Sequence, residues 1–286
     1  MKDLRGKVAA ITGGGSGIGR EIALACAREG ARIALADVDE AGMRETAALI
    51  APLGVDTHIV RCDVSKAGDV ENLAAEADRR FGGAQLVFNN AGVAVVGPSW
   101  TTTLEDWKWL LDVNLMGVVH GIRAFVPRML ERKDECHIVN TASVAGLVSL
   151  PGNSVYCASK HAVVALTECL RHELRLEKAS IGVSVLCPAY VNTGIFDSAR
   201  NRPAELAATN PNAAPYEAMG RKAVRSGKLS AADIARITLD AVKAGRFYIL
   251  THPRIKASIE IRMRDILEER DPTDTLPPVD RNKAGS

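Results

Sequence analysis

The sequence predicts an α/β protein with a doubly wound, parallel sheet of seven strands and helices on both faces. Three observations predict it. Short apolar runs alternate with longer amphipathic segments, several runs are apolar almost throughout, and a glycine-rich turn follows the first of them. Strands without polar alternation are typical of a sheet buried on both faces. Regular alternation of strand and helix, joined by right-handed crossovers, gives parallel strands. Ligands of such sheets bind beyond the carboxyl ends of the strands.

Each strand is expected at a short run rich in Val, Ile, Leu or Phe. The seven expected strands are residues 7–12, 32–37, 57–64, 85–92, 137–143, 182–188 and 246–251. Helices are expected where apolar residues recur with helical spacing between those runs. The six expected helices are residues 17–29, 39–51, 66–81, 104–132, 155–178 and 230–244.

Two segments depart from this alternation. Residues 194–228 are rich in Ala, Asn and Pro, and an insertion of this length is usually a lid or a binding loop. A variable surface excursion is the alternative. We expect one domain over residues 1–253, with 194–228 as a lid over its binding site, and a C-terminal helix and tail over 254–286. The end of that tail, from residue 271, has little to bury and is expected to be loosely held or to pack on a neighbouring subunit.

Composition excludes several classes of partner. The 286 residues are 47% hydrophobic and 24% charged with a net charge of +2, and no basic stripe suggests nucleic acid or a membrane surface. We expect no apolar stretch that approaches the length of a membrane span. Six scattered cysteines within apolar runs favour a reducing cytoplasm. "RHELR" at 171–175 lacks the second histidine of a zinc motif, so no metal is expected.

The turn "TGGGSGIG" at 12–19 is the first candidate binding element. A glycine turn between a buried strand and a helix presents backbone N–H groups and a helix N-terminus to an anion. Its glycines, Gly13, Gly17 and Gly19, are spaced G-x-x-x-G-x-G. A tight turn without a ligand is the alternative, but the flanking strand and helix favour phosphate binding.

Asp37 ends the second expected strand, about 20 residues after the glycine turn. An acidic residue there is placed to accept hydrogen bonds from adenosine ribose hydroxyls and would repel a 2′-phosphate. The glycine turn contains Ser16, just before Gly17, and has no Arg or Lys that could bind a 2′-phosphate. The pattern favours NAD over NADP; a solvated loop acid is the alternative.

Tyr156 and Lys160 lie in "SVYCASK", four residues apart in an expected helix, and therefore on one face. A phenol has a pKa near ~10, and a nearby cation lowers it. A tyrosine tuned in this way can exchange a proton with an alcohol or ketone oxygen. Taken alone, Y-x-x-x-K is too short to be specific.

The pattern is not alone. Ser143 in "NTASVAG" ends a strand 13 residues before Tyr156, Asn114 lies in "DVNLMG", and "NNAG" follows the fourth strand. Together with "TGGGSGIG", "CDV" and Asp37, this set closely resembles the short-chain dehydrogenase/reductase family over about residues 5–250. The resemblance implies a Rossmann fold with strand order 3-2-1-4-5-6-7.

The resemblance also implies residue roles. Tyr156 would be the general acid/base, Lys160 would lower its pKa and hold the nicotinamide ribose, and Ser143 would orient the reacting oxygen. Asn114 would hold a water that links Lys160 to solvent. The cofactor would be contacted by Gly13, Ser16, Gly17, Ile18, Gly19, Asp37, Val38, Asp63, Val64, Asn90, Ala91, Gly92, Tyr156, Lys160, Pro188, Ala189, Val191 and Thr193. Ala189 stands where the family usually has glycine.

These residues predict an NAD-dependent dehydrogenase or ketoreductase. The expected substrate-binding residues are Ser143, Val144, Ala145, Tyr190 and Phe196, with Ala94, Val95 and Leu147 as further candidates. Because most are apolar, we expect a hydrophobic or aryl secondary alcohol or ketone. A 3-oxoacyl-thioester reductase and a non-catalytic dinucleotide-binding regulator are alternatives. The family often forms tetramers or dimers through the helices at 104–132 and 155–178, so we expect a homotetramer or homodimer.

Overall fold

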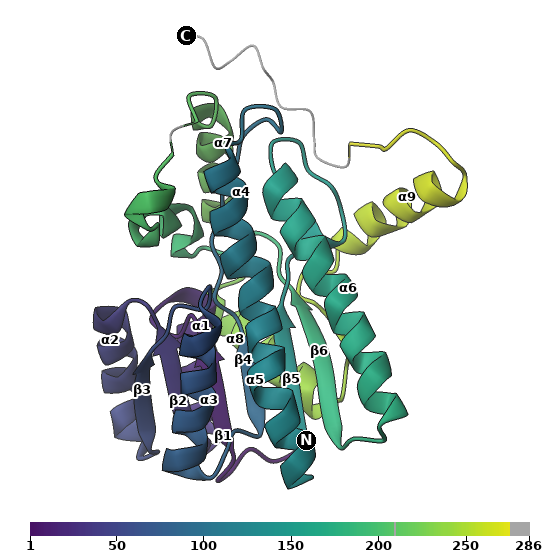
Figure 1. Cartoon of the computed structure of the whole chain (residues 1–286). Coiled ribbons are helices and arrows are strands. Elements are labelled where there is room, and N and C mark those ends of the chain that lie inside the picture. The colour runs from purple at the N-terminus through teal and green to yellow at the C-terminus, as the bar shows by residue number, and fades with distance from the viewer. Residues whose placement is uncertain (209, 275–286) are drawn as a thin grey trace.

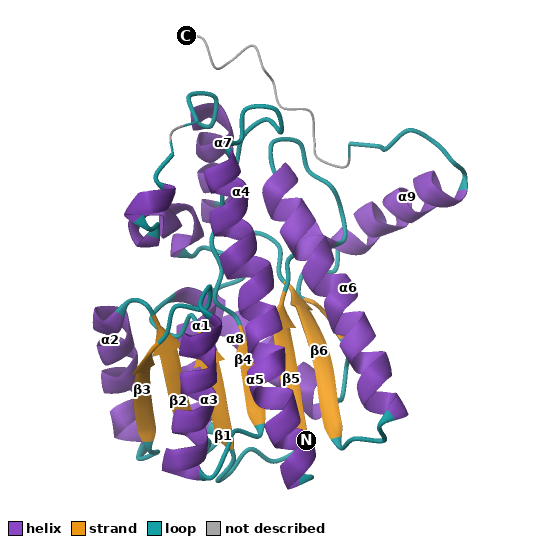
Figure 2. Cartoon of the chain, in the orientation of Figure 1, coloured by secondary structure: helices purple, strands orange, loops and turns teal. Residues whose placement is uncertain are grey.

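A computed structural model describes residues 1–208 and 210–274. Its centre is one sheet of seven parallel strands in the order β3-β2-β1-β4-β5-β6-β7, which confirms the predicted fold and strand order (Figures 1 and 2). The strands are β1 (Val8–Thr12), β2 (Arg32–Asp37), β3 (Thr57–Arg61), β4 (Leu86–Asn89), β5 (Cys136–Thr141), β6 (Ile181–Cys187) and β7 (Tyr248–Leu250).

Helices cover both faces of the sheet, and an apolar core lies under each face. The helices are α1 (Gly17–Arg28), α2 (Glu40–Ile50), α3 (Ala67–Phe81), α4 (Leu104–Leu111), α5 (Gly117–Arg132), α6 (Ser154–Leu176), α7 (Ala214–Arg225), α8 (Ala231–Lys243) and α9 (Ile255–Leu267). Ile22, Met43 and Leu239 bring α1, α2 and α8 into one core. Leu73 and Phe125 bring α3 and α5 into the other.

The helix expected over 104–132 contains a change of winding. A π-helical turn, η2 (Asp112–Met116), separates α4 from α5 without a break in the helix. The whole run is long and apolar enough to cross a membrane by length and composition alone, which corrects the expectation that no stretch approaches that length. Half of its most apolar window is buried inside the protein, as in a core helix of a globular protein.

The insertion at 194–228, predicted as a lid and hereafter called the lid segment, has three helical pieces among its described residues, 194–208 and 210–228. They are η4 (Gly194–Asn201), η5 (Ala204–Leu206) and α7. These pieces lie beyond the carboxyl ends of the strands, above the sheet in Figure 1. After β7 the chain forms α9, which points away from the sheet in the same view. The tail expected from residue 271 is described only to 274, and its remainder lies outside the described residues.

Candidate active site

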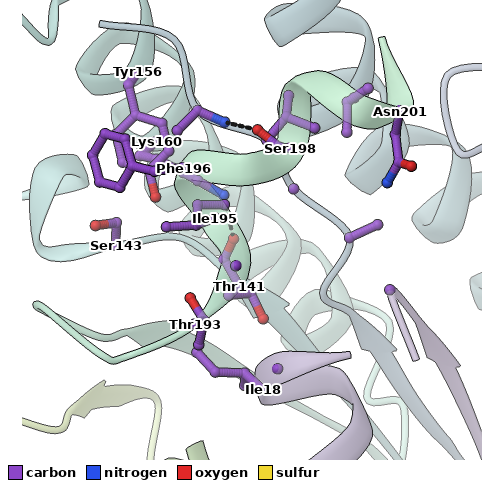
Figure 3. A pocket seen from close by; sticks show the side chains of 18 of the residues that line it. Ile18, Thr141, Ser143, Tyr156, Lys160, Thr193, Ile195, Phe196, Ser198 and Asn201 are labelled. Atoms are coloured by element: carbon purple, nitrogen blue, oxygen red, sulfur yellow. Dashed lines mark hydrogen bonds between the residues drawn. The ribbon is translucent and has the colours of Figure 1, made fainter. Parts of the chain in front are cut away.

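A cavity of about 750 Å³ opens beyond the carboxyl ends of the strands (Figure 3). Its walls come from the loops that follow the strands β1 to β6, from α4 and α6, and from the lid segment. Parallel strands end at the same edge of the sheet, so residues far apart in sequence meet there. The location agrees with the ligand position that the fold predicts.

The glycine turn forms one wall through close backbone contacts. Gly13 has a φ of +68°, and a Cβ on it would lie 2.9 Å from the Cα of Ala91. A Cβ on Gly19 would lie 2.1 Å from the carbonyl oxygen of Gly13. The hydroxyl of Thr12 accepts hydrogen bonds from the backbone N–H groups of Asn90 and Ala91, at 2.9 and 3.2 Å. The first turn of α1 is thereby packed directly on the loop after β4.

Asp37 lies at the end of β2, beside the glycine turn. Its carboxylate accepts hydrogen bonds from the backbone N–H of Gly15 at 2.9 Å and of Asp39 at 3.0 Å, one on each oxygen. An ionised carboxylate offers about four acceptor positions. The side chain is therefore oriented by the backbone and keeps accepting capacity for a ligand.

Tyr156, Lys160 and Ser143 come together on the other wall. Tyr156 and Lys160 lie on one face of α6, with the Lys160 Nζ 5.7 Å from the centre of the tyrosine ring. The Lys160 Nζ donates to the carbonyl of Thr141 at 2.9 Å, and only 3% of the lysine is exposed. Ser143 caps the turn after β5, where its hydroxyl accepts from the N–H of Ala145 at 3.2 Å. Figure 3 shows the three side chains on the same side of the cavity.

Burial changes the protonation of this group. It raises the pKa of Tyr156 from 10.0 to about 12, against an opposing effect of the hydrogen bond with Ser143. It lowers the pKa of Lys160 from 10.5 to about 8. The net shift of the tyrosine pKa is therefore opposite to the expected one. Desolvation of the phenol dominates, and the ammonium group is directed to the Thr141 carbonyl.

Asn114 is fully buried in the π-helical turn and does not line the cavity. Its side-chain oxygen accepts from the Val93 N–H at 2.8 Å, and its amide donates to the Val93 carbonyl at 3.0 Å. Its amide also lies 3.4 Å from the hydroxyl of Ser159, which donates to the Tyr156 carbonyl at 2.8 Å. The Asn114 side chain thus braces the loop after β4 against α6.

The remaining predicted residues divide clearly. Gly19 is packed behind the turn and does not line the cavity, but the other predicted cofactor residues and all five predicted substrate residues do. Of the further candidates, Ala94 lines it and Val95 and Leu147 do not. Sequence reasoning missed a group of apolar and polar residues from α4, the loop before α6 and the lid segment. This group includes Trp109, Leu150, Asn153, Leu206, Tyr216 and Met219.

Comparison with known proteins identifies the family. The family model described as short chain dehydrogenase matches residues 7–204, so the chain belongs to the short-chain dehydrogenase/reductase family. The CLA biosynthesis dehydrogenase/reductase of Lactiplantibacillus plantarum is 34% identical over 280 residues, 95% of this chain and 97% of that protein. The 1-deoxy-11-beta-hydroxypentalenate dehydrogenase of Streptomyces exfoliatus is 34% identical over 277 residues, 96% of this chain and 92% of that protein.

A solved structure is similar over nearly the whole chain. It is a short-chain dehydrogenase/reductase from Burkholderia phymatum in complex with NAD, with 47% identity and a TM-score of 0.95. The alignment covers 97% of this chain and 100% of that one. The family and these relatives define an oxidoreductase.

Proposed function

We propose that the protein is an NAD-dependent dehydrogenase or ketoreductase that interconverts a hydrophobic or aryl secondary alcohol and its ketone. The observation that carries the proposal is the meeting of Tyr156, Lys160 and Ser143 in one cavity whose other wall is a glycine turn followed by Asp37. A dinucleotide site and a proton-transfer group in the same cavity are what hydride transfer to or from an alcohol carbon requires.

The residues present fit a dinucleotide. The crowded Gly13 allows the backbone to approach a diphosphate closely, and α1 begins at Gly17 behind Ser16, so its first N–H groups face the cavity. NAD would supply the hydride acceptor, which no side chain can provide. We propose that Asp37 favours NAD over NADP, because a carboxylate would repel a 2′-phosphate. The NAD complex of the Burkholderia phymatum relative supports this choice.

In this proposal Tyr156 gives its proton to the carbonyl oxygen during reduction. During oxidation it takes the hydroxyl proton as the phenolate, a form that the positive charge of bound NAD⁺ would favour against the effect of burial on the tyrosine pKa. Ser143 shares the substrate oxygen through its hydroxyl and so orients the reacting carbon. Lys160, whose pKa burial lowers to about 8, keeps mainly its ammonium form at neutral pH and would hold the nicotinamide ribose beside Tyr156. We propose that Asn114 braces Val93 and the backbone around Tyr156, and the water-holding role that the family resemblance implies remains a prediction.

The substrate part of the cavity supports the proposed chemical class. Val144, Ala145 and Phe196 are joined there by Trp109 and Leu206, which gives this part of the wall a large apolar surface beside the polar reacting end. Such a surface binds an apolar body by burial and recognises one oxygen by hydrogen bonds. The Streptomyces exfoliatus relative is named as a dehydrogenase of a hydroxyl-bearing compound, which supports alcohol oxidation.

We further propose a cytoplasmic homotetramer or homodimer that associates through α4, α5 and α6. Five of the six cysteines are buried free thiols, as suits a reducing compartment. Leu104 is 82% exposed and Leu176 is 83% exposed, at opposite ends of this helical layer, and contact with a second copy would cover them. Light scattering at micromolar concentration tests the assembly, and a monomer contradicts it.

The decisive experiment measures cofactor binding and turnover separately. NAD⁺ and NADP⁺ are titrated by calorimetry, and a panel of aryl and alkyl secondary alcohols is then assayed with NAD⁺ by absorbance of the reduced cofactor. We expect turnover that falls by about 10³-fold in Tyr156→Phe, with NAD⁺ affinity unchanged, because only the proton-transfer group is lost. NAD⁺ binding without turnover of any alcohol or ketone would contradict the proposal and support a non-catalytic binder.

A further inference from the structure

One side chain of the lid segment, Arg202, is largely covered and is joined to the body of the protein by an ion pair. Its side chain is 12% exposed, and Asp106 on α4 is 4% exposed. The Arg202 Nη1 donates to the Asp106 Oδ1 at 2.5 Å. Removing one partner of a buried ion pair leaves the other charge desolvated and unpaired, so such pairs are costly to separate. The lid segment is therefore firmly attached at this point.

The same guanidinium holds two other parts of the cavity wall. Its Nε donates to the carbonyl of Leu206 at 2.6 Å, and its central carbon lies 5.0 Å from the ring centre of Trp109. The substrate cavity is lined by Leu206, Trp109 and Pro203, but Arg202 itself does not line it. One cation thus joins a lid turn, a tryptophan ring and helix α4 from behind the wall.

The carboxylate of Asp106 is oriented by the N-terminal cap of α4 as well as by Arg202. Its Oδ2 accepts from the backbone N–H of Thr103 at 3.1 Å, and its own N–H donates to the Thr103 hydroxyl at 3.1 Å. This reciprocal cap fixes the first turn of α4 and directs the second carboxylate oxygen, Oδ1, to Arg202. The ion pair is therefore built on a rigid helix end and not on a flexible loop.

The other half of the lid segment is attached more weakly. In α7 only Val224 is buried, and the ion pair of Arg221 with Asp197 has side chains 38% and 61% exposed. By contrast, the 194–206 half is held twice, by Arg202 and by the buried Ser198, whose hydroxyl accepts from the Ala94 N–H at 3.2 Å (Figure 3). The lid segment combines a fixed wall with a weakly attached helix.

We propose that Arg202 is a positioning residue that determines substrate size. It fixes Leu206 and Trp109 as a rigid apolar end wall, against which the part of the substrate remote from the reacting carbon packs. The inference rests on the proposed function, because it names what limits the apolar group of the alcohol. Substrates whose apolar body reaches this wall gain affinity from it, and smaller ones do not.

The test compares variants on both sides of the ion pair with matched controls. Arg202→Met removes the guanidinium group but keeps a side chain of similar size, and Arg202→Lys keeps the positive charge without the planar guanidinium. Asp106→Asn removes the negative charge but keeps an oxygen that can accept from the Thr103 N–H. Thr103→Ala removes the hydroxyl acceptor of the same helix cap and leaves Arg202 in place. Arg221→Ala removes an exposed ion pair and a hydrogen bond to the Phe196 carbonyl, and it is the control for the fluorescence measurement described below. Each variant is assayed with NAD⁺ on 2-alkanols from 2-butanol to 2-decanol and on 1-phenylethanol.

We expect Arg202→Met and Asp106→Asn to raise KM for the longest alcohols about tenfold, with kcat within about twofold and 2-butanol unaffected, because apolar contact is lost remote from the reacting carbon. Arg202→Lys recovers part of the loss. Thr103→Ala keeps the wild-type order of substrates. Unchanged selectivity in folded Arg202→Met and Asp106→Asn, whatever their thermal stability, would overturn the proposal.

A second readout needs no turnover. Trp100→Phe and Trp107→Phe together leave Trp109 as the fluorescent tryptophan, and acrylamide quenching then reports how accessible its ring is. In this background we expect quenching to increase in Arg202→Met and Asp106→Asn. It should stay unchanged in Arg221→Ala. If the wild type turned over no alcohol, the proposed function would fail while this measurement still reported on the wall. Equal quenching in all variants would overturn the role of Arg202.

Discussion

Gly19 in α1 and Gly220 in α7 are equally crowded positions with different neighbours. A Cβ on either would lie 2.1 Å from another atom, which is the carbonyl oxygen of Gly13 for Gly19 and the Phe196 Cζ for Gly220. The first neighbour is backbone between a strand and a helix, and the second is the tip of a side chain. The cofactor end of the cavity is thus defined by the main chain, and the substrate end by side chains that can move. The same substitution should therefore have different consequences at the two ends.

The largest effect is expected for Gly19→Ala. The added methyl cannot be accommodated without moving the glycine turn, so we expect a loss of about 3 kcal/mol in the free energy of unfolding. NAD⁺ affinity should fall with it. Urea denaturation and calorimetric titration measure the two losses. Gly68→Ala is the control, because a Cβ at this exposed helical glycine meets nothing within 4 Å. If the Gly19→Ala protein were as stable as the Gly68→Ala protein, the main chain would not define the cofactor end of the cavity.

The next effect concerns the pH dependence of stability. Because burial lowers the pKa of Lys160 to about 8, the unfolded chain binds a proton that the folded chain lacks between about pH 8 and 10.5. Stability contributed by this group therefore rises with pH in that window, by up to about 3 kcal/mol. Tyr156, with its pKa raised to about 12, acts oppositely between pH 10 and 12. We expect the difference in unfolding free energy between wild type and Lys160→Met to grow in favour of the wild type from pH 8 to pH 10. A constant difference would show that Lys160 is not titrating as a buried group.

A smaller effect is expected at Asp37. In Asp37→Asn one oxygen can still accept a backbone N–H, but the second acceptor and the charge are lost. We expect the Kd for NAD⁺ to rise about tenfold and the ratio of NADP⁺ to NAD⁺ affinity to increase. Calorimetry with both nucleotides measures the change. Glu40→Gln removes the same charge on the exposed surface of α2 and should leave both affinities unchanged; an equal change there would assign the effect to net charge alone.

The smallest effect is expected for Gly220→Ala. Phe196 can rotate away from a new methyl, so we expect less than about 1 kcal/mol of lost stability and an unchanged Kd for NAD⁺. The change should instead appear in the relative KM values of bulky and small alcohols, because Phe196 lines the cavity. Thermal unfolding measures the stability, calorimetry the Kd for NAD⁺, and the alcohol panel the KM values. Loss of NAD⁺ binding would show that the two ends are not independent.

The same difference explains what the sequence could predict. Strand order, the glycine turn and the meeting of Ser143, Tyr156 and Lys160 follow from local patterns placed on a known topology. The end wall does not, because Arg202 and Asp106 are 96 residues apart and neither belongs to a motif. The direction of the Tyr156 pKa shift was wrong for a related reason. It depends on how completely α6 and the cavity wall desolvate the phenol, which spacing along a helix does not report.

The π-helical turn at 112–116 depends on the number of residues between α4 and α5 as well as on which residues they are. Removing one residue there would restore continuous α-helical winding with α4 and α5 in nearly the same mutual orientation, because a π-helical turn accommodates one residue more than an α-helical turn. The turn that places Asn114 against Val93 would be lost, and with it the two hydrogen bonds between them. A single-codon deletion here should therefore be lost in a library that accepts many point substitutions. The lid segment, where the chain runs over the surface, is the place where related genes can gain or lose residues and so change substrates.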